Sequence, residues 1–345
     1  MQSLSATASV TGLPQGPGMS PRTRESVSSI ELRCPSCHKS LGHTSYRSLA
    51  RGKSSVFCGR CSTTLAEEQG IWFALPQARQ GHFARFVKEY EHIRREEGRG
   101  SNDAEFYLAL PYRDITGRNS WQWRIRGKTF HYIERRILPK LSRRGKLPLG
   151  ILDLGAGNGW MSHRLTRLGH RPVAVDLLTT SYDGLGAASH YQSALPEVFP
   201  RFQAELDNLP FAGEQFDCAI FNASFHYSEN YGRTLGEAIR CLRRGGTIVI
   251  ADSPSYSRES CGLQMREERQ AAFEKQYGFR SNGLSSCEYL TPERLIALEA
   301  RHDLEWTAHH IWYGIGWACR PWIAKWKKRR EPSQFVLYSA QVKPR

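Results

Sequence analysis

The chain of 345 residues lacks any apolar run of the roughly 18 residues that a membrane-spanning helix needs. Its first thirty residues are rich in Ser, Thr, Gly and Pro and lack the basic start and apolar core of a secretory signal peptide. Acidic residues are few, since 33 Asp and Glu face 48 Lys and Arg, for a formal net charge of +15. We expect a cytoplasmic protein whose positive field attracts phosphates, anionic lipid headgroups or acidic metabolites.

No internal repeat is present, and changes in composition divide the chain into four segments. Residues 1–29 have too few apolar side chains to offset the entropy of ordering, which predicts a disordered leader. Residues 30–76 hold paired cysteines and a short apolar strand, which predicts a small module of its own. Residues 77–146 predict an amphipathic helix, over about 82–97, followed by a partly helical, aromatic lead-in or lid. Residues 147–345 form the remaining domain.

That last domain alternates strand-like apolar runs with helical ones. The expected strands are 151–154, 172–176, 218–222 and 247–252, and the expected helices between them include 160–168 and 235–243. Such alternation predicts an α/β fold in which helices cover both faces of a parallel sheet. Two further runs, 304–312 and 335–342, predict a terminal antiparallel pair on that sheet.

The first strand of this domain runs into a glycine-rich turn. Glycines at alternate positions allow a tight turn over which a ligand can approach the backbone closely, and they occupy positions 155, 157 and 159. A dinucleotide-binding GxGxxG loop would need its last glycine at position 160 or 162, where Trp160 and Ser162 stand. Pyrophosphate binding is therefore disfavoured. The second strand ends at Asp176, where a carboxylate can accept both ribose hydroxyls of an adenosine.

The order of motifs resembles the type 11 class of S-adenosylmethionine-dependent methyltransferases over roughly residues 147–252. The series comprises the glycine loop, Asp176, the acidic loop 205–211, the Phe-Asp pair 216–217 and the turn 242–246. The resemblance implies a Rossmann-like, seven-stranded methyltransferase sheet with S-adenosylmethionine as cofactor.

It also implies a set of cofactor-binding residues: Asp153, Gly155, Ala156, Gly157, Asn158, Gly159, Asp176, Leu177, Glu205, Leu206 and Asn222. Within that set Asp176 would hold the ribose, and Glu205 with Leu206 would contact the adenine. Glu205 departs from the family pattern, in which a shorter Asp is frequent.

Methyl transfer from a sulfonium needs mainly in-line alignment, so few catalytic residues are required. Where the acceptor must lose a proton, His226 is the candidate base, with Tyr227 and Asn222 as its neighbours after the fourth strand. The alternative is that His226 merely closes the pocket. The absence of Asn-Pro-Pro-Tyr and Pro-Cys signatures there weighs against methylation of DNA amino groups and of cytosine C5.

Two CxxC pairs mark the N-terminal module. Four thiolates at this spacing predict one structural Zn²⁺ with no open coordination position, bound by Cys34, Cys37, Cys58 and Cys61. A redox pair or unpaired thiols are the alternatives. The module is similar to the zinc-ribbon leader that precedes several methyltransferase domains, although its segment 70–72 lacks the proline of that pattern.

The sequence gives the least information about the identity of the methyl acceptor. The resemblance implies a small-molecule or lipid-like acceptor. A ribosomal RNA (guanine) methyltransferase is one alternative, and a catalytically inactive zinc-ribbon interaction scaffold is another. A basic aromatic insertion at 313–332 interleaves tryptophans with Lys and Arg, so its residues 313–330 predict contact with RNA, peripheral contact with a membrane surface, or only a solvated helix.

Overall fold

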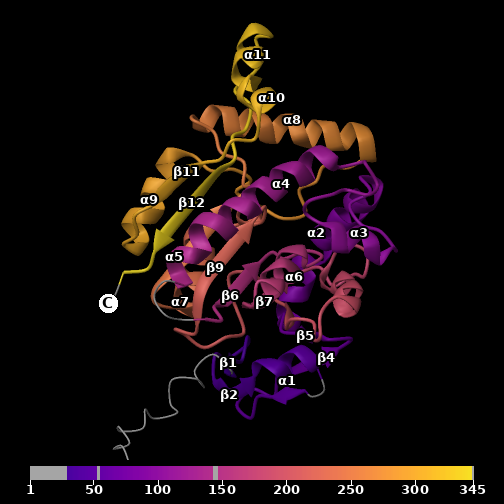
Figure 1. The fold of residues 1–345 in the computed structure, drawn as a ribbon, viewed down its shortest axis with the longest axis vertical. Helices are drawn as coiled ribbons and strands as arrows, with labels where there is room; N and C mark the ends of the chain where they lie inside the picture. The colour runs from indigo at the N-terminus through magenta and orange to yellow at the C-terminus, as the bar shows by residue number, and fades with distance from the viewer. Residues whose placement is uncertain (1–28, 53–54, 143–146, 344–345) are drawn as a thin grey trace, which may run out of the picture.

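The computed structural model describes residues 29–52, 55–142 and 147–343 (Figure 1). The predicted leader, residues 1–29, lies outside this part of the chain except for Ser29. The described residues form a ten-stranded mixed sheet and a separate two-stranded ribbon. From one edge to the other, the strands of the large sheet are β11 (Thr307–His310), β12 (Val336–Gln341), β10 (Leu242–Ala251), β9 (Phe216–Asn222), β6 (Gly150–Leu154), β7 (Arg171–Asp176), β8 (Arg201–Gln203), β5 (Ile71–Phe73), β4 (Thr64–Glu68) and β3 (Val56–Phe57).

Seven of these strands, β6 to β12, make the sheet that the sequence predicts. Strands β6 to β10 run parallel, β12 is antiparallel to β10, and β11 is antiparallel to β12. Side chains alternate between the two faces, so that Ile151 and Leu152 lie in different apolar cores. The expected α/β class, with its terminal antiparallel pair, is confirmed.

Helices cover both faces of the sheet (Figure 1). On one face, Leu235 and Leu298 bring α7 (Tyr231–Cys241) and α9 (Pro292–His302) onto the strands. The opposite face is covered by α3 (Ala104–Ala109), α4 (Ser120–Tyr132), the π-helical turn η2 (Ile133–Ile137), α5 (Leu138–Ser142), α6 (Trp160–Arg167) and the 3₁₀ segment η3 (Leu185–Ser193).

Three further segments lie near the carboxyl ends of the parallel strands, where they border the cavities described below. They are α2 (Gln77–Glu96), the short turn η4 (Phe225–Tyr227) and α8 (Glu259–Tyr277). The helix expected over 82–97 thus begins five residues earlier, at Gln77, directly after Pro76.

The N-terminal segment is joined to the large sheet by main-chain hydrogen bonds. It comprises a ribbon of β1 (Ser29–Arg33) and β2 (Ser40–Ser45), the helix α1 (Tyr46–Arg51) and strands β3 to β5. β5 pairs in parallel with β8, with Trp72 opposite Phe202. Without β5, β8 would present unpaired backbone groups at the sheet edge. The segment expected to be a module of its own therefore continues the sheet of the following domain.

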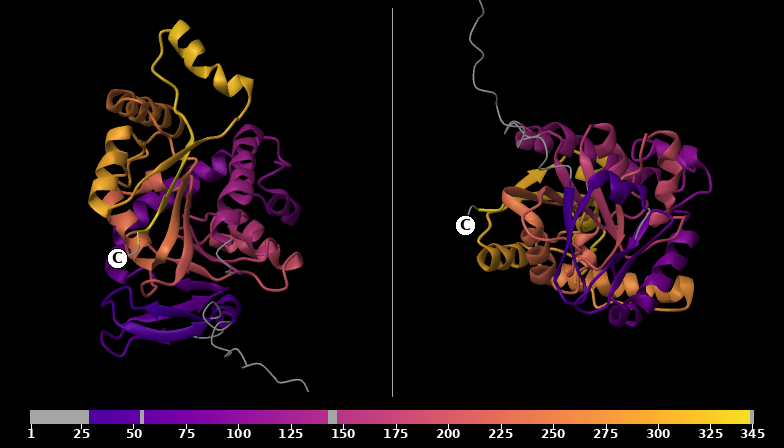
Figure 2. Two further views of the ribbon diagram at one scale, coloured as in Figure 1. Left: turned by 60° about the vertical axis from the view of Figure 1, so that its left-hand side comes forward. Right: turned by 90° about the horizontal axis from the view of Figure 1, so that it is seen from below.

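The basic aromatic insertion forms an arm between β11 and β12. It contains the short helices α10 (Ile315–Ala318) and α11 (Arg320–Trp326). Both ribbon views show α11 extending past α8, away from the sheet (Figures 1 and 2).

Candidate active site

The glycine loop connects β6 to α6 at the carboxyl edge of the sheet. The amides of Gly155 and Ala156 donate to the carbonyl of Val175, at 2.8 and 3.0 Å, which ties the loop to β7. Gly155 has a φ of +73°, and a Cβ there would lie 2.2 Å from the Cβ of Ser224. Only glycine fits both the conformation and the close approach.

Asp176 lies at the end of β7 and holds the same loop. Its carboxylate accepts hydrogen bonds from the amides of Gly157, at 2.7 Å, and Leu178, at 2.9 Å. Burial raises the pKa of Asp176, while these backbone bonds oppose that shift. A carboxylate offers about four acceptor positions. The carboxylate can therefore accept a further hydrogen bond besides those from the backbone.

Asp153, at the end of β6, anchors the start of α6 from below the loop. Its Oδ2 accepts from the amide of Ser162, at 3.1 Å, and from the Ser162 hydroxyl, at 2.7 Å. The residue is 2% exposed, and burial raises its pKa to about 7. Asp153 therefore sets the geometry of the strand–loop–helix junction.

A cavity at this edge gathers most of the residues that the sequence singles out. Those lining it are Asp153, Gly155, Ala156, Gly157, Asn158, Asp176, Leu177, Leu206, Asn222 and Tyr227. Three predicted residues lie elsewhere. Gly159 caps α6 against Phe199, His226 opens onto a neighbouring cavity, and Glu205 forms an ion pair with Arg79 of α2 at 2.8 Å. Leu206 thus lines the cavity, whereas the Glu205 carboxylate is turned to Arg79.

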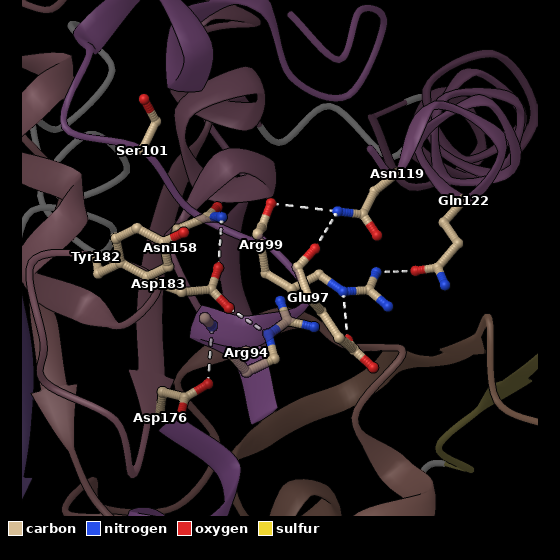
Figure 3. Close-up of polar contacts among 12 residues, drawn as sticks. Arg94, Glu97, Arg99, Ser101, Asn119, Gln122, Asn158, Asp176, Tyr182 and Asp183 are labelled. Atoms are coloured by element: carbon tan, nitrogen blue, oxygen red, sulfur yellow. Dashed lines mark hydrogen bonds and ion pairs between the residues drawn. The ribbon is translucent and has the colours of Figure 1, made fainter. Parts of the chain in front are cut away.

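The cover of this cavity comes from α2, which lies in the segment 77–146 for which the sequence predicts a lead-in or lid, but its ion pair was not predicted. Arg94 forms an ion pair with Asp183, which also accepts from the side-chain amide of Asn158 at 3.0 Å (Figure 3). Asp183 is only 4% exposed. One carboxylate therefore links the helix above the cavity to the glycine loop below it. No local motif marks this pairing, because 89 residues separate Arg94 from Asp183.

A second cavity adjoins the first, and the two share part of their walls. Phe86, Tyr90 and Tyr227 line both, with ring centroids 5.5 to 6.0 Å apart. Arg94, Arg126 and Ala223 are also common to both. The arrangement fits a donor and an acceptor that meet at the aromatic wall.

His226 and Asp252 both line the second cavity. Nδ1 of His226 lies 3.3 Å from the Ser253 hydroxyl, and burial, followed by the charges of Arg269 and Arg126, lowers its pKa to about 3. Oδ1 of Asp252 accepts from the Thr129 hydroxyl at 2.7 Å, and burial raises its pKa to about 6. The imidazole is thus neutral near pH 7, and its burial and the two arginines weaken it as a base.

The four cysteines of the CxxC pairs converge although they come from different turns. Their sulfurs all lie within 4.8 Å of one another, and the Cys34–Cys61 and Cys37–Cys58 pairs are each 3.5 Å apart. A tetrahedral zinc with Zn–S bonds of about 2.3 Å separates its sulfurs by about 3.8 Å. His38 is not part of the cluster. The donor set and its spacing fit Zn²⁺.

Among the described residues, no helix combines the length and apolar character needed to cross a membrane.

Comparison with known proteins bears on this site directly. Residues 152–250 match the model of a methyltransferase domain, type 11. A malonyl-[acyl-carrier protein] O-methyltransferase of Buchnera aphidicola is 28% identical over 103 residues, which cover 30% of this chain and 39% of that protein. A phthiotriol/phenolphthiotriol dimycocerosates methyltransferase of Mycobacterium leprae is 33% identical over 102 residues, covering 30% and 37%. The chain thus spans less than half the length of these curated relatives.

Among solved structures, a putative methyltransferase from Bacillus halodurans aligns with a TM-score of 0.40 at 15% identity, over 60% of this chain and 99% of that one. The matched segment of the chain begins within β6 and ends within β10, and so contains both strand ends that border the first cavity. Residues 152–250 of the chain are thus similar to a methyltransferase domain.

Proposed function

We propose that this protein is an S-adenosylmethionine-dependent methyltransferase with a small-molecule or lipid-like acceptor. One observation carries the proposal: a glycine loop and a strand-end carboxylate, Asp176, border one cavity that adjoins a second one, whose wall combines aromatic and apolar side chains with charged ones. The names of the curated relatives, which specify a malonyl-[acyl-carrier protein] and phthiotriol dimycocerosates, support this acceptor class.

S-adenosylmethionine supplies an electrophilic methyl group on a sulfonium. The residues of this chain would bind it and align the acceptor. Asp176 would accept the ribose hydroxyls, and Leu206 would contact the adenine. Phe86, Tyr90 and Tyr227 exclude water from the junction of the two cavities, which keeps the reacting pair desolvated.

Where the acceptor must lose a proton, His226 is the proposed base. Asn222 and Tyr227 are its proposed neighbours in the site. The neutral imidazole accepts a proton from the acceptor side of the junction. His226→Ala should therefore slow single-turnover methyl transfer by about a hundredfold with an acceptor that loses a proton. Affinity for S-adenosylhomocysteine should stay unchanged. Equal transfer rates in both proteins would leave His226 a wall residue.

The proposed cofactor is tested by thermal unfolding with three ligands. S-adenosylhomocysteine should raise the unfolding temperature, whereas NAD⁺ and ADP should leave it unchanged, because the turn lacks the third glycine of a pyrophosphate loop. Stabilisation by NAD⁺ alone would replace the methyltransferase proposal with a dinucleotide-binding one. No response to S-adenosylhomocysteine would favour the inactive-scaffold alternative.

We also propose that Cys34, Cys37, Cys58 and Cys61 bind one structural Zn²⁺. The site packs against the loop that follows β8, since the side-chain amide of Asn208 donates to the carbonyl of Pro35, between the first two cysteines, at 2.7 Å. Cys58→Ser should abolish stoichiometric zinc and lower the unfolding temperature. Cys319→Ser, at an exposed thiol outside the cluster, is the matched control. Full zinc content in Cys58→Ser would contradict the assignment.

The arm at 313–330 is proposed to contact an anionic membrane surface. Three large apolar side chains there are more than three-fifths exposed, Ile315 at 75%, Trp322 at 81% and Trp326 at 82%, and Trp312, directly before the arm, is 64% exposed. Exposed Lys325, Lys327, Lys328 and Arg329 accompany them. Interfacial tryptophans beside basic side chains suit anionic headgroups.

Vesicle sedimentation tests this contact. Binding should be stronger to phosphatidylserine-containing vesicles than to phosphatidylcholine alone, and should weaken in the double variant Trp322→Ala, Trp326→Ala. Ile296→Ala, which removes a side chain 61% exposed on α9, should bind as the unaltered chain does. Loss of RNA binding in the double variant, with vesicle binding retained, would support the ribosomal RNA alternative instead.

A further inference from the structure

The second cavity contains an arginine whose charge no neighbouring group balances closely. Arg126 lies on α4 and borders both cavities, at the place where a methyl donor and its acceptor would meet. The inference that follows rests on the proposed function, because it concerns the acceptor side of the same site.

The other arginines around this cavity are all paired. Arg94 binds Asp183, the Nε of Arg99 lies 2.7 Å from Glu97, and Arg269 lies 2.7 Å from Glu288. Figure 3 shows the first two of these pairs. Each of these guanidinium groups has its own carboxylate.

Arg126 differs from them. Within the described residues it forms no ion pair and no hydrogen bond, and its guanidinium lies 4.7 Å from the ring centre of Trp123. The carboxylate that influences it most favourably, Asp252, is beyond ion-pair distance and accepts from Thr129 instead.

The surroundings make this charge costly. Burial, together with the charges of Arg94 and Arg99, lowers the pKa of Arg126 to about 10. The Arg126 side chain is half-buried at the border of the two cavities, where a planar guanidinium gains most from a carboxylate that accepts two parallel hydrogen bonds. A ligand anion in the cavity would supply the hydrogen-bonded negative charge that Arg126 lacks.

We propose that Arg126 binds a carboxylate of the methyl acceptor. A carboxylate brings one negative charge, which matches the single unpaired guanidinium. Part of the remaining wall suits an apolar body, since Ile93, Ile125, Met265, Phe273 and Leu284 line it beside polar and charged side chains. The acceptor is thus an amphipathic carboxylic acid, held by its anionic group beside the junction of the cavities.

This assignment also affects the candidate base. Arg126 is one of the two cations that lower the pKa of His226. A carboxylate paired with Arg126 would cancel part of that field and make the imidazole a stronger base when the acceptor is bound. The acceptor would then help to activate the group that deprotonates it.

The test uses octanoate, octanamide and octyl phosphate as probes, titrated calorimetrically into the full chain with and without saturating S-adenosylhomocysteine. Octanoate should bind at least about tenfold more tightly than octanamide, because only the anion pairs with Arg126. Arg126→Gln should reduce octanoate affinity to that of octanamide, and Arg126→Lys should retain an intermediate affinity. Arg124→Gln, on an exposed neighbour of the same helix, should change nothing.

Equal binding of octanoate and octanamide to the unaltered chain would overturn the proposal, whether or not Arg126→Gln folds. Unchanged octanoate affinity in a folded Arg126→Gln would overturn it too, and tighter binding of octyl phosphate would overturn the choice of carboxylate. Failure of S-adenosylhomocysteine to bind would count against the proposed function alone, because the probes are also titrated without it.

Discussion

The first cavity is bounded on one side by the glycine loop and Asp176, here called its floor, and on the other by α2, here called its cover. The floor and the cover are held in place by different kinds of contact. The floor is fixed by main-chain groups: amides of the glycine loop donate to Val175 and Asp176 at 2.7 to 3.0 Å. The cover is attached by side chains, chiefly the ion pair of Arg94 with Asp183. A main-chain floor is rigid and specific in shape, while a side-chain clasp can open to admit and release a ligand.

Substitutions in the floor and in the cover should therefore affect ligand binding differently. A change in the floor removes contacts to the ligand and distorts the loop that shapes its site. A change in the cover leaves the site intact but lets it open more readily. Affinity should suffer most from the first, and dissociation rates should change most in the second.

The largest expected effect is that of Asp176→Ala. It removes the proposed ribose acceptor and the partner of the Gly157 and Leu178 amides, so affinity for S-adenosylhomocysteine should fall by about a hundredfold. Calorimetric titration measures it, with Asp303→Ala as control, since that side chain is 80% exposed and pairs with Lys343. Normal affinity in a folded Asp176→Ala would refute the ribose assignment.

A smaller effect is expected from Arg94→Gln in the cover. Loss of the Asp183 ion pair should weaken S-adenosylhomocysteine by about tenfold, mainly through faster dissociation. Stopped-flow displacement separates the two rates. Arg95→Gln, on the exposed neighbour along α2, should behave like the unaltered chain. A slower association with unchanged dissociation would contradict a role of the Arg94–Asp183 ion pair in retaining the ligand.

The smallest effect concerns pH and the floor. Burial raises the pKa of Asp153 to about 7 in the folded chain, above the value of about 4 in an unfolded one. The folded state therefore binds the proton more tightly, and the stability it gains is present at low pH and lost as the pH rises through about 7. Between about pH 5 and about pH 8, the unfolding temperature of Asp153→Asn should fall less than that of the unaltered chain. Identical profiles would contradict the shift.

The floor of the cavity could be predicted from the sequence because its conformation depends on residues that are close together in the chain. The positive φ of Gly155 and the place of Asp176 at a strand end leave a mark in the order of residues. The same holds for the strand alternation, which is confirmed up to the terminal antiparallel pair of β11 and β12.

The cover could not be predicted in this way, since its contacts join distant segments. Arg79 and Glu205 are 126 residues apart, and nothing near Glu205 signals that its carboxylate faces α2. The pairing of β5 with β8 could not be predicted for a related reason. β8 has only three residues, too few to show a strand pattern, and its free edge exists only once the sheet is assembled.

The most direct test of this account is calorimetric titration of the full, unaltered chain with S-adenosylhomocysteine. The account predicts one binding site per chain with micromolar affinity, since the floor and its cover are assembled in the described residues. Absence of binding by a folded, zinc-loaded protein would contradict it and would leave the methyltransferase fold without its cofactor.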